Sequence, residues 1–431
     1  MKRTLIACLA SLFPLAASAA DLLGIYQRAL ANDARFAAAR AELLAGQERV
    51  VQGRAGLLPD VALTANAARN VVDPAGGPSD SFSSNSWRVQ LTQPLFRMQN
   101  FIAARQGALQ TDLAGVQFGQ ARQDLILRVA QDYFGVLNAL DALDAVTQLR
   151  TAAEEQLEIA KTSFEVGTVT ITDVHEAQSR FDLAQAQVIA AEAALDVARD
   201  TLARTVGGEP GELSRLRSGV SFAAPEPNDA MSWAGAASDA SLEVQVQLLL
   251  QEIAAREVDR ARAGHLPTLD LVASHGVGTR QNNGLSPRTE TTTIGLQFNM
   301  PLYAGGRISS VSRETAALKV RADADLESAR RSSALAAREA YLGVSSGLAR
   351  IRALEAAEVS SLSALEANRL GYEVGVRINI DVLNSLTQLA ETRQELARAR
   401  YDTLLAQLRL KAAAGSLDEP DLQSINTLLA P

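Results

Sequence analysis

An internal repeat is the strongest constraint on how this 431-residue chain can fold. When the sequence is compared with itself at a shift of 208 residues, related motifs align in the same order. A repeat of this length is too long for one solenoid unit, so we expect two homologous halves. The aligned motifs include Arg54-Ala55-Gly56 with Arg262-Ala263-Gly264, Tyr133 with Tyr341, Phe164-Glu165-Val166-Gly167 with Tyr372-Glu373-Val374-Gly375, and Gly207 with Gly415.

Each half is predicted to begin with a helical segment, over 22–57 and over 241–266. Both segments end just before a proline, Pro59 or Pro267, because proline cannot continue a helix. Two segments of alternating apolar and polar residues follow in each half. Their length of about ten residues is what a tilted membrane-spanning strand needs. The predicted strands are 60–70, 86–94, 268–278 and 292–301.

A long helical hairpin is predicted after each pair of strands, over 98–206 and over 306–415. The first arm, about 68 residues at about 1.5 Å each, would be on the order of 100 Å long. Its apolar residues recur at alternating spacings of three and four, which is a heptad seam. The seam residues are Ile126, Val129, Tyr133, Val136, Leu140 and Leu143 in the first half, and Ala334, Ala337, Tyr341, Val344, Leu348 and Ile351 in the second.

The domain organisation follows from this order of elements. The first structural repeat is assigned to 21–206 and the second to 241–415. Between them, 207–240 is rich in Gly, Pro, Ser and acidic residues, which predicts a connector with little regular structure. The last segment, 416–431, is assigned as a C-terminal tail.

Residues 1–20 have the pattern of a secretory signal peptide. Lys2 and Arg3 precede an apolar stretch, and small residues follow it. Cleavage after Ala19 or after Ala20 fits equally well, and either removes Cys8, the only cysteine. A lipoprotein signal at Cys8 is disfavoured because its apolar region would be far shorter than the roughly 7–15 residues such signals use. We therefore expect an exported chain without disulfides.

The remaining composition excludes several classes of protein. No other segment approaches the roughly 18 apolar residues of a spanning helix, so membrane insertion would have to use strands. The net charge of −8 argues against nucleic acid as a partner. His175, His265 and His275 lack zinc-ligand spacing, and no phosphate-binding loop or nucleophile motif occurs. We expect no metal, no cofactor and no enzymatic activity.

Four amphipathic strands cannot stand in lipid as an open sheet. The two edges would leave backbone groups unpaired, at a cost of several kcal/mol each. Three copies would supply twelve strands and twelve helical passes, whereas a dimer would give an eight-stranded barrel filled by its own side chains. The predicted fold class is mainly helical with membrane strands: a trimeric twelve-stranded β-barrel continued by a twelve-helix periplasmic α-barrel.

The two hairpin tips, 164–174 and 372–384, resemble the periplasmic tips of the TolC family. Segments 301–307, 394–401 and 415–422 add to the resemblance, which spans essentially the whole mature chain. It implies a homotrimeric duct in outer-membrane lipid that extends into the periplasm. It also implies docking on a periplasmic adaptor protein and an inner-membrane pump, as in type I secretion and multidrug efflux.

The resemblance also implies roles for five tip residues. Asp173, Tyr372 and Arg377 match links that hold the closed periplasmic mouth shut. Asp381 matches one of two aspartates that ring the aperture, and Asn384 departs from the second. We hypothesise that multivalent cations bind this mouth less tightly than one in which both positions are acidic. The alternative is that these side chains belong to solvated hairpin tips.

Four further tip residues match the grooves that accept an adaptor's hairpin tips: Val166, Gly167, Val374 and Gly375. Glycine lets another backbone approach closely and permits the turn. The alternative is that both glycines only end helices.

Two other classes of protein compete with the duct. A periplasmic coiled-coil adaptor, or membrane fusion protein, would need one helical hairpin flanked by compact β modules. An enzyme or surface-binding protein on long helices should show a cluster of convergent polar groups. The two hairpins alternating with two strand pairs favour the duct.

Overall fold

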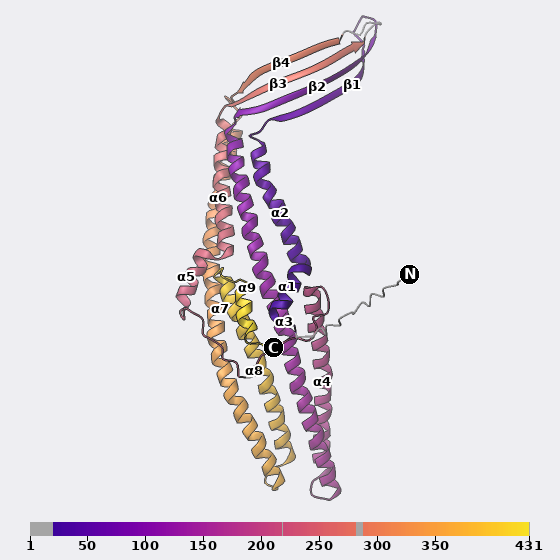
Figure 1. Ribbon diagram of the computed structural model, residues 1–431, viewed down its shortest axis with the longest axis vertical. Helices are drawn as coiled ribbons and strands as arrows, with labels where there is room; N and C mark the ends of the chain where they lie inside the picture. The colour runs from indigo at the N-terminus through magenta and orange to yellow at the C-terminus, as the bar shows by residue number, and fades with distance from the viewer. Residues whose placement is uncertain (1–19, 218, 282–287, 431) are drawn as a thin grey trace, which may run out of the picture.

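The computed structural model of the chain describes residues 20–217, 219–281 and 288–430. Most of the predicted signal peptide, residues 1–19 with Cys8 and the first cleavage position, lies outside the described residues. Figure 1 shows an elongated molecule, with a sheet at one end and two helical hairpins at the other. Within the described residues, none of the helices is long and apolar enough to cross a membrane.

The two halves contain the same order of elements. In the first half these are α1 (Leu22–Asn32), α2 (Ala34–Ala55), β1 (Asp60–Val72), β2 (Asp80–Phe96), α3 (Met98–Glu165) and α4 (Ile171–Val206). In the second half they are α5 (Ala230–Ala240), α6 (Leu242–Arg262), the short 3-10 helix η1 (Ala263–His265), β3 (Thr268–Gln281), β4 (Arg288–Asn299), α7 (Arg307–Glu373) and α8 (Asn379–Ala413). Helix α5 is the counterpart of α1, because a shift of 208 residues carries Leu22–Asn32 onto Ala230–Ala240, whereas α9 (Glu419–Asn426) lies outside this repeated pattern.

The helical segment predicted over 22–57 is two helices, because Asp33 interrupts it. The Asp33 carboxylate caps α2 by accepting a hydrogen bond from the Phe36 amide at 2.7 Å. It also forms an ion pair with Arg128 of α3 at 3.2 Å. A capping aspartate that is itself paired starts a new helix rather than continuing the old one.

The connector over 207–240 is more regular than its composition predicts, since it ends in α5. Asp229 caps this helix through the amides of Met231 and Ser232. Ala234 and Ala237 are buried, and α5 packs along α7. The tail over 416–431 likewise contains α9, which Asp418 and Asp421 cap. Local caps and small buried residues therefore outweigh the Gly and Pro content of these segments.

The four strands form one antiparallel sheet in the order β1-β2-β3-β4. All four extend beyond the predicted limits at one end or both, most clearly β2, which begins at Asp80 rather than near 86, while β4 ends at Asn299, two residues before its predicted end. The polar first residues of β2 pair with β1 on one side and, from Ser83 on, with β3 on the other. Ladder hydrogen bonds thus hold a Ser- and Asn-rich segment extended that would otherwise favour a loop.

The register separates an apolar face of the sheet from a polar one. Val61 pairs with Leu91, Leu91 with Ala273 and Ala273 with Ile294, so one apolar row crosses all four strands. The remaining apolar side chains on this face include Leu63, Trp87, Val89, Leu271, Leu296 and Phe298. The opposite face carries Thr64, Asn66, Arg88, Gln90, Ser274, Thr291, Thr293 and Gln297.

The two hairpins, α3–α4 and α7–α8, lie side by side, with α3 against α8. The largest core cluster sits at mid-height, where α1, α3, α8 and α9 meet. Tyr133 is fully buried there and donates a hydrogen bond to the Ser214 carbonyl at 2.7 Å. Phe134 stacks on Tyr401 with ring centroids 5.6 Å apart. The heptad seam of α3 is therefore the core of the molecule, and the tips extend beyond it.

Candidate functional site

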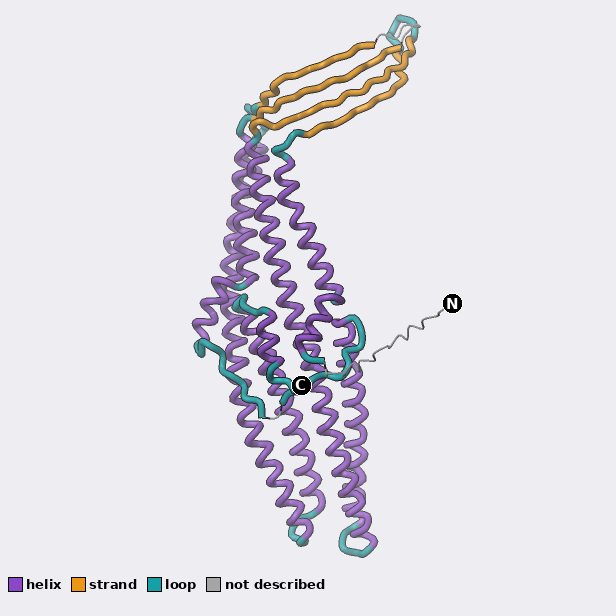
Figure 2. Tube along the Cα trace, viewed as in Figure 1, coloured by secondary structure: helices purple, strands orange, loops and turns teal. Residues whose placement is uncertain are grey.

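Each hairpin ends in a tight turn at the end of the molecule opposite to the sheet (Figure 2). Gly167 and Gly375 occupy equivalent positions after α3 and α7, with φ angles of 77° and 75°. The amide of the next residue donates back into the helix, Thr168 to Ser163 and Val376 to Gly371. This left-handed conformation is the reason the turns need glycine.

The tips expose apolar side chains to solvent in the single chain. Val166 and Val374 are 71% and 65% exposed, and Val376 is 78% exposed. A Cβ atom added at Gly167 or Gly375 would meet nothing within 4 Å. The four residues expected to accept an adaptor therefore lie together in pairs, one pair at each tip, with open space in front of them.

The three expected latch residues are placed apart in the single chain. Asp173 forms a capping box with Thr170, accepting from its amide at 2.8 Å and from its hydroxyl at 2.8 Å. Tyr372 packs against the apolar cluster between α7 and α8. Arg377 forms an ion pair with Asp381 at 3.5 Å. Among the described residues, no hydrogen bond or ion pair joins Asp173 to Tyr372 or Arg377.

The two expected aperture residues are both in contact with an arginine. Asp381 lies in the first turn of α8 and forms an ion pair with Arg377, which precedes it by four residues. Asn384 accepts a hydrogen bond from Arg180 of α4, with Nη2 and Oδ1 2.9 Å apart. Sequence patterns did not single out Arg180, because nothing in the spacing of the repeat indicates which residue of α4 faces Asn384.

Contacts between the two hairpins continue upward from the tips. Leu383 of α8 is buried among residues of the first hairpin, including Ala153, Leu157 and Ala177. Asn379, one turn before Leu383, is only 3% exposed, and neither atom of its side-chain amide has a hydrogen-bond partner. A buried polar group without a partner costs roughly 1–3 kcal/mol, so this contact is not optimised for stability.

Arginine and tyrosine side chains join the hairpins higher up. Arg393 of α8 donates to Gln148 of α3 at 2.9 Å and also contacts Glu358 of α7 at 3.0 Å. Tyr401 donates to Asp141 at 2.6 Å. Burial raises the pKa of Asp141 above its ordinary value, and the Tyr401 hydrogen bond partly opposes that rise. The seam between α3 and α8 is thus polar at several levels.

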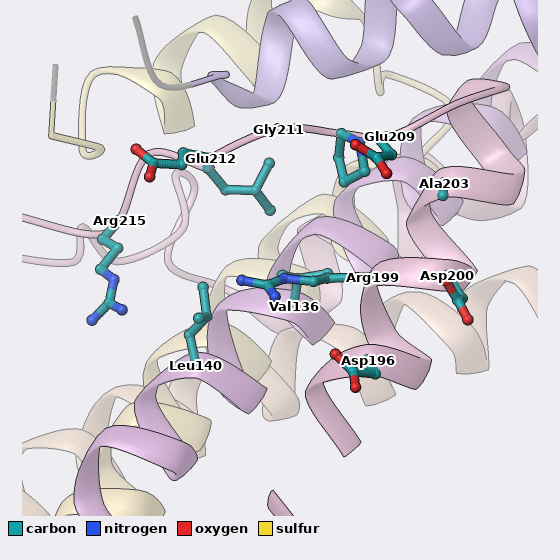
Figure 3. A pocket seen from close by; sticks show the side chains of 12 residues that line it. Val136, Leu140, Asp196, Arg199, Asp200, Ala203, Glu209, Gly211, Glu212 and Arg215 are labelled. Carbon is teal, nitrogen blue, oxygen red and sulfur yellow. The ribbon is translucent and has the colours of Figure 1, made fainter. Parts of the chain in front are cut away.

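A hollow of about 940 Å³ lies at mid-height between α3, α4 and the segment after α4. Figure 3 shows Arg199 extending from α4 into the hollow, with Glu209 and Glu212 on the overlying segment. Four acidic side chains and two basic ones line this hollow, so its lining is acidic on balance. Within the part of the chain that the structure describes, no group of three or more His, Cys, Asp or Glu side chains could hold a metal ion.

The sheet and the two parallel hairpins define a class of protein, the outer-membrane channel fold. The crystal structure of the outer membrane protein VceC from Vibrio cholerae has this fold, with a TM-score of 0.77 and 19% identity over 91% of this chain and 96% of that one. The Campylobacter jejuni CmeC outer membrane channel is similar, with a TM-score of 0.79 and 16% identity over 94% of this chain and 89% of that one.

The chain belongs to the outer membrane efflux protein family, whose sequence profile matches residues 25–208 and again residues 233–416. The two matches begin 208 residues apart, which is the shift that aligns the two halves with each other. Outer membrane protein TolC of Escherichia coli is 34% identical over 96% of this chain and 85% of its own length. Alkaline protease secretion protein AprF of Pseudomonas aeruginosa is 33% identical over 95% of this chain and 87% of its own.

The resemblance to the TolC family is therefore confirmed. The alternative of a periplasmic adaptor is excluded, because the family is one of outer-membrane efflux proteins and the relatives match along most of their length. The residue roles at the tips are not decided by these similarities and stay predictions.

Proposed function

We propose that three copies of this chain form the exit duct of a tripartite efflux or type I secretion system, opened at its periplasmic tip by an adaptor and an inner-membrane pump. The chain is an outer-membrane protein of the efflux family that extends into the periplasm. The duct transports passively and carries out no catalysis. The observation that carries the proposal is the sheet, whose two faces differ in polarity and whose two edges, β1 and β4, each have one paired neighbour in the chain.

The sheet favours closure by copies of itself. Ile294, Leu296 and Phe298 of the edge strand β4 are each at least 65% exposed on the apolar face. Such a face suits lipid, but open edges in hydrocarbon would cost several kcal/mol for each unpaired backbone group. Pairing β4 of one copy with β1 of the next removes both edges. Three copies then give twelve strands, with the polar face lining a lumen.

The helices support the same arrangement. Helices α4 and α7 flank the paired arms α3 and α8, and both carry exposed apolar residues. Leu183 and Val197 on α4 are 54% and 67% exposed, while Leu342 and Val359 on α7 are 60% and 67% exposed. Apolar residues that recur along one helix face usually pack against another helix. We propose that the apolar face of α4 in one copy packs against the apolar face of α7 in the next copy.

This arrangement gives the latch residues a way to meet. If α4 of one copy adjoins α7 of the next, then the tip that carries Asp173 lies next to the tip that carries Tyr372 and Arg377 of a neighbour. Exposed pairs contribute only about 0–1 kcal/mol each. A threefold set of such pairs would hold the mouth closed. It would still open when a partner binds the open mouth only modestly more tightly than the closed one.

The adaptor docks on the tips in this proposal. Val166 with Gly167, and Val374 with Gly375, present an apolar side chain beside an uncovered backbone. A hairpin tip of a partner could contact both without displacing any atom of this chain. The other partner is outer-membrane lipid, and the acidic chain, with its net charge of −8, is not suited to nucleic acid.

Cross-linking tests the assembly directly, since Cys8 is the only natural cysteine and lies in the predicted signal peptide. The double variant Leu183→Cys with Val359→Cys, treated with a short bismaleimide in outer membranes, should give a covalent trimer. Each single variant serves as a control and should stay monomeric, because the proposed contact joins two different faces. A ladder that ends at dimers, or no cross-linking in the double variant, would reject the trimer.

A further inference from the structure

A hydrogen bond between Arg180 and Asn384 connects the two hairpins. It joins residues 204 positions apart, on α4 of the first hairpin and α8 of the second. The guanidinium of Arg180 is a permanent positive charge with five N–H donors, of which this bond uses one. Its acceptor is a neutral amide oxygen. Among the described residues, no carboxylate forms an ion pair with Arg180, so its charge is not compensated locally.

The same bond places this charge at Asn384, within one helical turn of Asp381. Asn384 follows Asp381 by three residues in α8, so the two side chains lie on one face of the helix. On the other side of Asp381, the guanidinium of Arg377 lies 3.5 Å from the carboxylate. Arg377 therefore pairs with Asp381, while Arg180 bonds the residue three positions further along the helix, so these four side chains together carry one net positive charge.

We propose that Arg180 shifts the charge selectivity of the periplasmic mouth away from cations and toward anions. The inference rests on the proposed duct, in which Asp381 and Asn384 line the aperture. Three copies would then place three Arg180 guanidinium groups beside three Arg377–Asp381 ion pairs at the opening, and the latch would bring three Asp173 carboxylates to the same Arg377 side chains. Charges that line a narrow hole act on every passing ion, because few water molecules separate the ion from the wall. Arg180 also opposes the binding of multivalent cations at Asp381.

The ratio of potassium to chloride permeability measures this effect. Wild-type trimers and variants would be reconstituted in planar bilayers under a KCl gradient, and the reversal potential recorded. Arg180→Gln should raise the ratio about threefold, the change expected when one screened unit charge per copy is removed from within several ångströms of the ion path. Asn384→Asp should shift the ratio in the same direction. Arg180→Lys, which keeps the charge and changes the hydrogen-bond geometry, should leave the ratio close to wild type.

Arg199→Gln is the matched control. It removes the same charge from the same helix, but 19 residues further along and so about 28 Å from Arg180. It should leave the reversal potential unchanged. A second readout is block by a trivalent cation such as hexaamminecobalt, which should become stronger in Arg180→Gln and not in Arg199→Gln.

The outcomes separate the inference from the proposed function. Channels of normal conductance whose reversal potential is the same in wild type and Arg180→Gln would overturn the inference and leave the duct standing. Equal shifts in Arg180→Gln and Arg180→Lys would also overturn it, because they would show that the tie between the hairpins matters and the charge does not. Wild-type protein that forms no channels would reject the duct and the inference together.

Discussion

Tyr401 of α8 donates a hydrogen bond to the carboxylate of Asp141 of α3, with the two oxygens 2.6 Å apart. The tyrosine is 4% exposed, and Arg215 approaches the same carboxylate at 3.8 Å. The contact ties the two hairpins together at the main core, of which Tyr401 is part. It therefore affects both the stability of the protomer and the ease with which one hairpin moves against the other.

Tyr401→Phe should lower the free energy of unfolding by about 1–3 kcal/mol, because the half-buried carboxylate of Asp141 loses its donor. Thermal unfolding of the detergent-purified protein measures the change. Tyr341→Phe is the control: its hydroxyl donates to Asn228 at an exposed site, so the loss should stay within about 0.5 kcal/mol. Equal losses in the two variants would contradict the assigned role of the buried contact.

The pH dependence of stability should reflect Asp141. Burial raises the pKa of this carboxyl in the folded chain, so the folded state keeps a proton that the unfolded state has already released. Stability should therefore fall as the pH rises from the ordinary aspartate pKa toward the raised one. Asp141→Asn should remove that part of the slope in unfolding curves recorded from acid to neutral pH. Asp144→Asn, at an exposed neighbour, should retain it.

Leu383→Ala should loosen the contact between the hairpins. The side chain is 2% exposed, and its loss should cost about 2–4 kcal/mol through the cavity that it leaves. Hydrogen exchange should rise in the lower halves of α3 and α8 more than in the main core. Leu342→Ala, at an exposed position of α7, should leave exchange within a monomeric protomer nearly unchanged, and a comparable rise there would contradict this account.

Alanine at the tip glycines should strain the backbone. Gly167→Ala and Gly375→Ala place a Cβ at positive φ, at roughly 1 kcal/mol each, although no neighbouring atom obstructs it. Affinity for an adaptor, measured by surface plasmon resonance, should fall in both variants. Gly135→Ala provides the control, because this helical glycine also has open space around it and should gain slightly in stability. Unchanged adaptor affinity in both tip variants would contradict a role of the glycines in docking and would show that they only end the helices.

Much of the fold could be predicted because local patterns determine it. The alternation of apolar and polar residues from Val61 indicates a strand with one lipid-compatible face, and the heptad series through Tyr133 indicates a helix with one buried face. Each pattern occurs again in the second half, so each prediction rests on two segments of the sequence. The structure adds one local feature that the sequence patterns were not used to predict, the capping box that Thr170 and Asp173 form at the start of α4. It explains why Asp173 is engaged locally in the single chain.

Other features could not be predicted because they depend on packing between distant segments. The interruption at Asp33 reflects its pairing with Arg128 as well as its capping of α2. The Arg180 to Asn384 bond depends on how the two hairpins are rotated against each other, which no spacing within either hairpin encodes. The buried Asn379 lies at a position where a sequence pattern alone predicts a solvated helix start.

The pairing of β2 with β3 joins the two repeats within one chain. A single repeat, with two strands and one hairpin, would need six identical copies to build a ring of the same size. Joining two repeats lets alternate hairpins evolve separately, so one tip carries Thr170 and Ile171 where the other carries Ile378 and Asn379. In the proposed trimer, a substitution in one tip would change every second hairpin around the circumference and leave the hairpins between them as they were.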